Sequence, residues 1–371
     1  MPKPVYDHKC EKRYPHADDM LEREIADNGF SSGWAMHQKP VPEYFFDSHI
    51  HYCGPRDNSM QDRLRICMKK WESMETPREL IILNIYGDNK DSAVPVYASE
   101  DYWFYTQTQW GTVEEAKKFL GDLPEKGHIY WSAWLDHREP NPNLVHSAAQ
   151  AGAVSIKLHN APVIEFNEPY DIWLSDKWQD VFRAIDERGL PILFHVTQRL
   201  PSSNYSGGGR NTYWETGWKN GVTYSNEDLL QTFLTCCSRY PGIDFIGAHQ
   251  LHIGWERLDE LFTALPNLYV DTTIGCMLHL YDDFFDHDKE YLRAIFIKWA
   301  DRIIFGTDSL WCSNEQNAAN EQNAANEQHA ANMLLLKHQR FITSLDLPGD
   351  VLNKICHGNM ERLHRINPLT I

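Results

Sequence analysis

The sequence lacks any long apolar stretch. No run approaches the roughly 18 consecutive apolar residues that a membrane-spanning helix needs, and residues 1–30 contain no apolar segment that could serve as a signal-peptide core. These absences exclude a transmembrane protein and argue against a secreted one. We therefore expect a cytoplasmic protein that has no membrane partner.

Positive charge and cysteine pairs are also scarce. Lys and Arg number 35 against 52 Asp and Glu, so the net charge of −17 repels both a nucleic-acid backbone and anionic lipid. None of the 8 cysteines forms a Cys-x-x-Cys pair, which argues against a disulfide framework and against a thiolate zinc site. We expect reduced thiols and no nucleic-acid partner.

Apolar residues occur in short runs separated by helical patterns. Eight runs rich in β-forming residues are candidate strands: 44–48, 80–86, 128–135, 154–158, 191–196, 243–248, 268–273 and 303–307. Segments such as 176–188 and 227–239 between them carry apolar residues at helical spacing. Alternating strands and helices give a parallel sheet, and eight such units close into a (β/α)8 barrel of the α/β class.

Three segments stand outside this alternation. Residues 1–43 are predicted to form an N-terminal extension packed on a barrel domain of residues 44–371. Residues 201–210, with glycines at 207–209, are interpreted as a long insertion after the fifth strand, which could be a lid or a solvated loop. A six-residue repeat at 314–331 is interpreted as a helical or flexible insertion, because its copies would present different helix faces.

Residues 45–51, Phe-Phe-Asp-Ser-His-Ile-His, carry the strongest chemical signal. His49 and His51 end the first apolar run with one residue between them. Because alternate residues of a strand face the same side, both imidazoles can project into the barrel mouth and share one cation. Taken alone, such a pair is equally compatible with packing.

Four further strand ends carry polar side chains. Lys157 and His159 end the fourth strand, and the others are His195 on the fifth, His249 on the sixth and Asp308 on the eighth. In a barrel these ends lie on the catalytic face. Burying so many polar groups without partners would cost several kcal/mol each, and a divalent cation supplies the missing partner.

This ordered series resembles the amidohydrolase superfamily, whose members carry His-x-His on strand one, Lys on four, His on five and six, and Asp on eight. Residues 307–311 (Thr-Asp-Ser-Leu-Trp) and 356–364 (Cys-His-Gly-Asn-Met-Glu-Arg-Leu-His) are most similar to the "amidohydrolase 2" branch, which contains aminocarboxymuconate semialdehyde decarboxylase. The resemblance spans residues 44–365.

The resemblance implies a metal held by His49, His51, His195 and Asp308. Zinc is the expected metal, with manganese as the alternative, and one ion is expected rather than two. Asp308 would also transfer the proton of the attacking water, and His249 would polarise the substrate carbonyl. Lys157 either bridges two metals as a carbamate or contacts the substrate.

The site implies a small-molecule substrate, which we expect to be anionic. His159, Arg199, Asn84 and Tyr86 are candidate substrate-binding residues, although each could also be a structural residue. The favoured function is hydrolysis of a carboxylate-bearing amide, lactone or similar compound by metal-activated water. The alternatives are a non-oxidative carboxy-lyase acting on an aromatic or unsaturated acid, and a non-catalytic binding barrel. A homo-oligomer is compatible with the sequence.

Overall fold

A computed structural model describes residues 42, 45–52, 81–86, 129–198, 212–273, 282–311, 338, 341–343 and 345–366. The predicted N-terminal extension, apart from residue 42, lies outside these described residues. So do the insertion at 201–210 and the repeat at 314–331, and the interpretations given to these segments stay predictions.

The strands form one parallel sheet that closes on itself. In chain order the strands are β1 (Asp47–Tyr52), β2 (Ile81–Tyr86), β3 (Ile129–Trp134), β4 (Ser155–His159), β5 (Ile192–His195), β6 (Phe245–Gly247), β7 (Leu268–Asp271), β8 (Ile303–Ile304) and β9 (Ser309–Trp311). Their order in the sheet is β8-β7-β6-β5-β4-β3-β2-β1-β9. Because β8 and β9 are successive parts of one final run, β8 on β7 and β9 on β1 close the cylinder. The predicted (β/α)8 barrel is confirmed.

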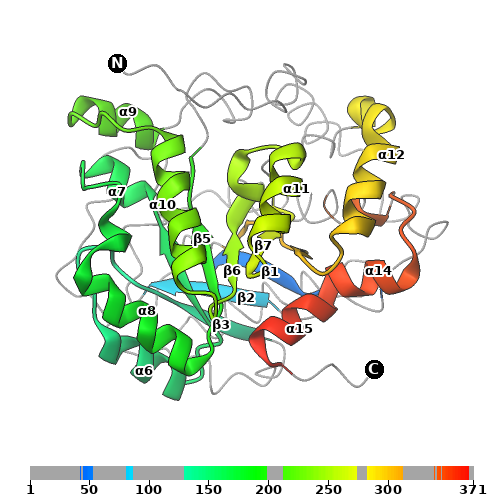
Figure 1. Ribbon diagram of the computed structural model, residues 1–371. Coiled ribbons are helices and arrows are strands. Elements are labelled where there is room, and N and C mark those ends of the chain that lie inside the picture. The colour runs from blue at the N-terminus through cyan, green and yellow to red at the C-terminus, as the bar shows by residue number, and fades with distance from the viewer. Residues whose placement is uncertain are drawn as a thin grey trace, which may run out of the picture.

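The described helices pack along the outside of this sheet, as Figure 1 shows. They are α6 (Pro142–Gln150), α7 (Ala161–Glu165), α8 (Asp176–Arg188), α9 (Thr212–Lys219), α10 (Asn226–Arg239), α11 (Trp255–Ala264), α12 (Asp282–Lys298), α14 (Gly349–Asn353) and α15 (Asn359–His364). Shorter helical segments are η3 (Ile172–Leu174), η4 (Ala248–His252) and η7 (Lys354–Gly358).

Within the part of the chain that the structure describes, no helix has both the length and the apolar character needed to cross a membrane.

Two helices illustrate how the sequence sets their limits. Helix α8 has the predicted bounds, buries Trp178, Val181, Phe182 and Ile185 on one face, and ends at Gly189, whose φ of 60° is left-handed. Helix α10 begins one residue earlier than predicted. The Ser225 hydroxyl at its N-cap accepts from the Asp228 amide, and the Asp228 carboxylate accepts from the Ser225 amide.

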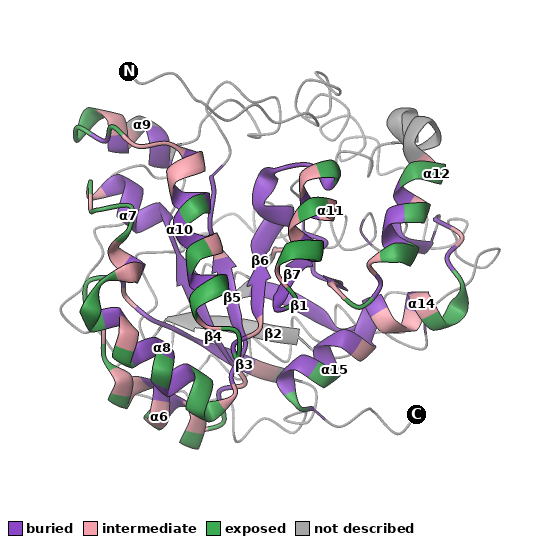
Figure 2. Cartoon of the chain, in the orientation of Figure 1, coloured by how far each residue is buried: buried purple, intermediate pink, exposed green. Residues whose placement is uncertain are grey.

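Side chains alternate between two apolar layers along β5, β6, β7 and β8. Phe194, Phe245, Leu268 and Ile303 join the large cluster that includes the buried faces of the surrounding helices. Leu193, Ile246, Tyr269 and Ile304 form a second cluster with Met360 and Leu363 of α15, which packs against the inner residues. Figure 2 shows that most described residues of the strands are buried. The residues that follow these inner side chains on the same face of the strands lie at the polar strand ends.

A bulge in β1 changes this alternation. Phe45 belongs to the outer cluster and Phe46 to the inner one, so strict alternation would turn residue 49 outward and residue 50 inward. The register instead shifts between Asp47 and Ile50, and Ile50 joins the outer cluster. His49 consequently faces the interior, since an extra residue in a strand reverses the faces that follow it.

The first and last strands differ from their predicted limits. The first is predicted at 44–48, but β1 begins at Asp47, because the backbone of Phe46 bonds to Cys356 O of η7 (2.7 Å) instead. The last is predicted at 303–307, but β8 ends at Ile304 and pairing resumes at Ser309. Between them Asp308 has a positive φ of 57°, which interrupts the extended backbone.

Gly306, in the link between β8 and β9, generates the first prediction. A Cβ added there would lie 2.7 Å from Ser48 Oγ and 3.3 Å from His49 Cβ, whereas one at Gly349 would meet nothing within 4 Å. We expect Gly306→Ala to lower the free energy of unfolding by about 1–3 kcal/mol through overpacking. Gly349→Ala, the control, should change it by less than about 1 kcal/mol. Urea titrations compare them, and equal stability of the two variants would contradict the close packing described at this link.

Candidate active site

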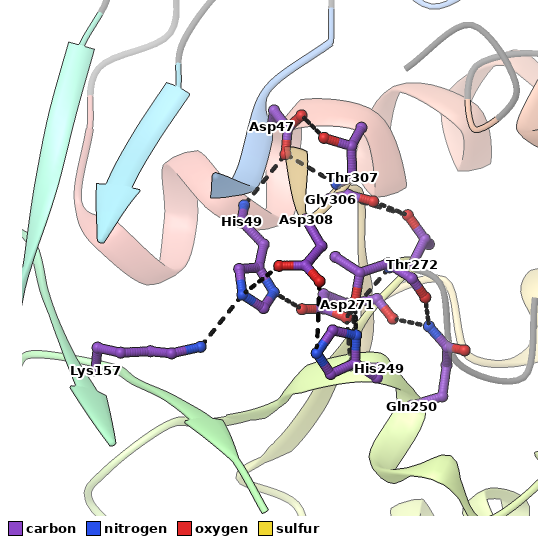
Figure 3. Close-up of polar contacts among 11 residues, drawn as sticks. Asp47, His49, Lys157, His249, Gln250, Asp271, Thr272, Gly306, Thr307 and Asp308 are labelled. Atoms are coloured by element: carbon purple, nitrogen blue, oxygen red, sulfur yellow. Dashed lines mark hydrogen bonds and ion pairs between the residues drawn. The ribbon is translucent and has the colours of Figure 1, made fainter. Parts of the chain in front are cut away.

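His49 lies at the centre of the polar strand ends. Its side chain is fully buried, and Nδ1 lies 2.8 Å from Asp271 Oδ2 on β7. Its Nε2 atom is 3.2 Å from Lys157 Nζ on β4 and 3.4 Å from Asp308 Oδ1. Figure 3 shows Lys157, Asp271 and Asp308 approaching the ring from different sides. The His49 imidazole thus contacts side chains from three other parts of the barrel.

Asp47 ties β1 to the residues that carry Asp308. Its carboxylate accepts from the Thr307 amide (3.0 Å), the Thr307 hydroxyl (2.6 Å) and the His49 amide (3.2 Å). The Asp308 amide in turn donates to His49 O at 2.8 Å. Burial raises the pKa of Asp47 to about 7, against the lowering effect of these bonds. These contacts fix where Asp308 leaves the barrel wall.

His249 follows β6 on a left-handed turn. The φ angles of residues 249–252 run from 49° to 57°, an unusual series for residues other than glycine. The His249 amide donates to Asp271 Oδ1 at 2.8 Å, and its Nδ1 atom lies 2.9 Å from Thr273 Oγ1. Its Nε2 atom faces Asp308 Oδ2 at 3.9 Å. The turn therefore directs this imidazole toward the same carboxylate that His49 meets.

Among the described residues, two groups of three side chains have ligand-type atoms within 4.8 Å of one another. The first is His49, His249 and Asp308, and the second is His195, His249 and His252. Burial lowers the pKa of His249 to about 4 and that of His195 well below its usual range. Both imidazoles are therefore neutral at pH 7, which is the form that binds metals. The buried Nε2 atom of His195 has no hydrogen-bond partner among the described residues.

Lys157 and His159 face the interior from β4. Burial lowers the pKa of Lys157 to about 8, while the carboxylates of Asp308 and Asp271 act in the opposite direction. His159 accepts from the Ala161 amide through Nδ1 (2.8 Å) and stacks on Trp134 with ring centroids 5.2 Å apart. Its ring centroid is 4.2 Å from that of His195. Both residues therefore lie beside the groups that could bind a cation.

The structure brings together His49, Lys157, His159, His195, His249 and Asp308, as the strand-end pattern predicts. The backbone of His51 pairs with Asn84 of β2 and Leu310 of β9, and Tyr86 pairs with Trp134. Arg199 and the side chains of His51, Asn84 and Tyr86 lie outside the described residues. Their roles stay predictions.

Sequence reasoning missed Asp271, Thr273 and the role of Asp47. Asp271 is fully buried and contacts both His49 and His249. The sequence does carry a signal for it, because residues 268–271 read Leu-Tyr-Val-Asp and end an apolar strand on a charge, as the fourth and fifth strands end on histidine. His252, which belongs to the second group of possible ligands, stacks on His249 with ring centroids 5.1 Å apart.

A model of the amidohydrolase family matches residues 132–366, more than half of the chain. The chain belongs to the amidohydrolase family. It is an enzyme of that family, and the match confirms the predicted resemblance to the "amidohydrolase 2" branch. No curated protein sequence matches the chain.

Solved structures share the amidohydrolase fold at low sequence identity. One is 5-carboxyvanillate decarboxylase from Novosphingobium aromaticivorans, complexed with manganese and 4-hydroxy-3-methoxy-5-nitrobenzoic acid. It is 12% identical, the match covers 89% of this chain and 99% of that one, and the TM-score is 0.50. Dihydroorotase from Campylobacter jejuni is 14% identical, with 91% and 87% covered and a TM-score of 0.49. The likeness to the decarboxylase supports the barrel fold and says nothing of this chain's reaction.

The second prediction concerns Asp47. Replacement by alanine leaves the buried Thr307 hydroxyl and two amides without their acceptor, at about 1–3 kcal/mol for each unsatisfied group. We expect Asp47→Ala to lower the urea midpoint strongly. Asp180→Ala, the control, removes an ion pair whose side chains are 61% and 66% exposed, and such pairs contribute at most about 1 kcal/mol. Equal midpoints for the two variants would show that Asp47 does not hold the barrel closed.

Proposed function

We propose that this amidohydrolase-family enzyme is a hydrolase that uses one divalent cation, zinc in preference to manganese. The observation that supports the cation site is the convergence of the Nε2 atoms of His49 and His249 on the two carboxylate oxygens of Asp308, at 3.4 and 3.9 Å. His51 and His195 complete the proposed ligand set, as the strand-end pattern predicts.

The donor set fits a cation of this kind. Two imidazoles and one carboxylate offer nitrogen and oxygen atoms that zinc accepts, and both imidazoles are buried. Asp308 is partly exposed, with 26% of its side chain accessible, so the group also has an open side. When bound, a cation here lowers the pKa of water to about 7 and so supplies a nucleophile at neutral pH.

Residues of the chain would transfer the proton, bind the cation and bind the substrate. Asp308 accepts the proton of the attacking water and returns it to the leaving group, because its carboxylate is the acid or base on the open side of the site. His249 directs Nε2 at Asp308, which favours a ligand role over the carbonyl-polarising role expected from the sequence. Lys157 is the nearby donor that can bind an oxygen of the substrate.

The proposed substrate is a small anionic amide, lactone or similar compound. Lys157 supplies a buried amine on the inner face of β4, next to His49, in a chain that is otherwise strongly acidic. A carboxylate on the substrate would pair with this amine. The specific compound is not fixed by these contacts, since the loops that follow several strands lie outside the described residues.

The third prediction separates metal binding from proton transfer. His49→Ala should lose bound metal, because it removes a central ligand, whereas His146→Ala on α6 should retain it as the control. Asp308→Asn keeps an oxygen for coordination but abolishes proton transfer. We expect it to retain metal while turnover falls by roughly 10²- to 10⁴-fold. Elemental analysis of the purified proteins gives the metal content.

Turnover is measured by incubating the wild type with panels of lactones, amides and aromatic carboxylates, and following release of acid or of CO2. Acid release supports the hydrolase, and CO2 release without hydrolysis would replace it by the carboxy-lyase. Full metal content in His49→Ala would contradict the proposed ligand set. Unchanged turnover in Asp308→Asn would show that the proton moves through another group.

A further inference from the structure

The buried carboxylate of Asp271 is hydrogen-bonded to His49 and His249. Asp271 Oδ2 lies 2.8 Å from His49 Nδ1. The other oxygen, Oδ1, accepts from the His249 amide at 2.8 Å and from the Thr273 hydroxyl at 2.6 Å. That hydroxyl oxygen lies 2.9 Å from His249 Nδ1. Asp271 therefore reaches the His49 ring directly and the His249 ring through Thr273.

The hydrogen count fixes which ring nitrogen carries the proton. An ionised carboxylate can only accept, so the single hydrogen of the Thr273 hydroxyl goes to Asp271. The hydroxyl oxygen therefore accepts from His249 Nδ1, as it does from the His249 amide at 3.2 Å. The Asp271 carboxylate likewise accepts from His49 Nδ1. Both rings therefore carry their proton on Nδ1 and keep the lone pair on Nε2. These are the two Nε2 atoms that face the carboxylate of Asp308.

We propose that Asp271 and Thr273 are positioning residues that hold His49 and His249 in the same tautomer, with both Nε2 lone pairs directed at one point. The benefit to cation binding rests on the proposed function, whereas the tautomers follow from the hydrogen bonds alone. Partners behind a ligating histidine orient the ring and commonly change metal affinity by about 10- to 100-fold.

Gln250 fastens the two strand ends together. Its fully buried side-chain amide donates one hydrogen to Asp271 O (2.7 Å) and the other to Thr273 O (2.6 Å). The left-handed turn that contains His249 is thereby tied to the end of β7. The turn carries backbone strain, which persists only where surrounding contacts hold it. The Thr273 hydroxyl consequently stays within hydrogen-bonding distance of the His249 ring.

The test uses the full-length protein with three threonine variants. Thr273→Val removes the hydroxyl and keeps the shape of the side chain, while Thr273→Ser restores the hydroxyl. Thr272→Val is the matched control, because Thr272 is equally buried and neighbouring, but its hydroxyl bonds to the backbone of Gly306. Asp271→Asn is a fourth variant that should disturb both rings, and Thr273→Val keeps the test valid if Asp271→Asn fails to fold.

Two readouts are needed. Nitrogen-15 NMR of histidine-labelled, metal-free protein reports the tautomer of each ring, with His49 and His249 assigned from His→Gln spectra. Zinc titration against a competing chelator reports affinity. In Thr273→Val we expect His249 to leave the pure Nδ1-protonated form, His49 to keep it, and zinc affinity to fall about 10- to 100-fold. Thr273→Ser and Thr272→Val should match the wild type in both readouts.

The outcomes distinguish this proposal from the proposed function. If Thr273→Val keeps the wild-type tautomer and zinc affinity, the positioning role is overturned and the metal site stands. The same holds if Thr272→Val disturbs His249 as much as Thr273→Val does. If the wild type binds no zinc, the proposed function fails, and the tautomer assignment is decided by the NMR spectra alone.

Discussion

The seam between β1 and the final strand run is the constraint on which the site depends. Asp47 and Thr307 are 260 positions apart in the chain, yet the Asp47 carboxylate accepts two hydrogen bonds from Thr307. The Asp308 amide then donates to His49 O. These bonds close the barrel and, in the same place, set the proposed cation ligands His49 and Asp308 side by side. Closure of the barrel therefore also positions the site, because the bonds that join the two ends of the sheet place Asp308 next to His49.

The interior is divided along the barrel axis into an apolar part and a polar part. The inner residues of β5, β7 and β8 are apolar where α15 packs against them, and the next inward positions carry His195, Asp271 and the Gly306 that lies against His49. Buried charges are costly unless they are paired and hydrogen-bonded. Here Asp271 accepts four hydrogen bonds, counting that from His49 Nδ1. The inner apolar cluster, packed against α15, fixes the strands so that the polar groups at their ends can make these hydrogen bonds.

Much of this arrangement could be predicted because strand alternation and strand ends are local features of the sequence. Apolar runs that are followed by His or Asp predict that His49, His195, His249 and Asp308 lie at strand ends. The bulge that turns His49 inward has no such local signal, since it depends on pairing with β2. The left-handed turn at 249–252 is likewise set by distant partners, among them Thr197, whose hydroxyl donates to Leu251 O. Asp271 obeys the same strand-end rule and could have been predicted from it.

The central claim is that the Nε2 atoms of His49 and His249 and the carboxylate of Asp308 bind one divalent cation. The most direct measurement is X-ray diffraction from crystals of the zinc-loaded protein, collected on both sides of the zinc absorption edge. The account predicts a single anomalous peak among these three groups, at about 2.0–2.2 Å from each coordinating atom. No peak at this position, or a zinc ion bound elsewhere while His49 keeps contact with Lys157, would contradict it.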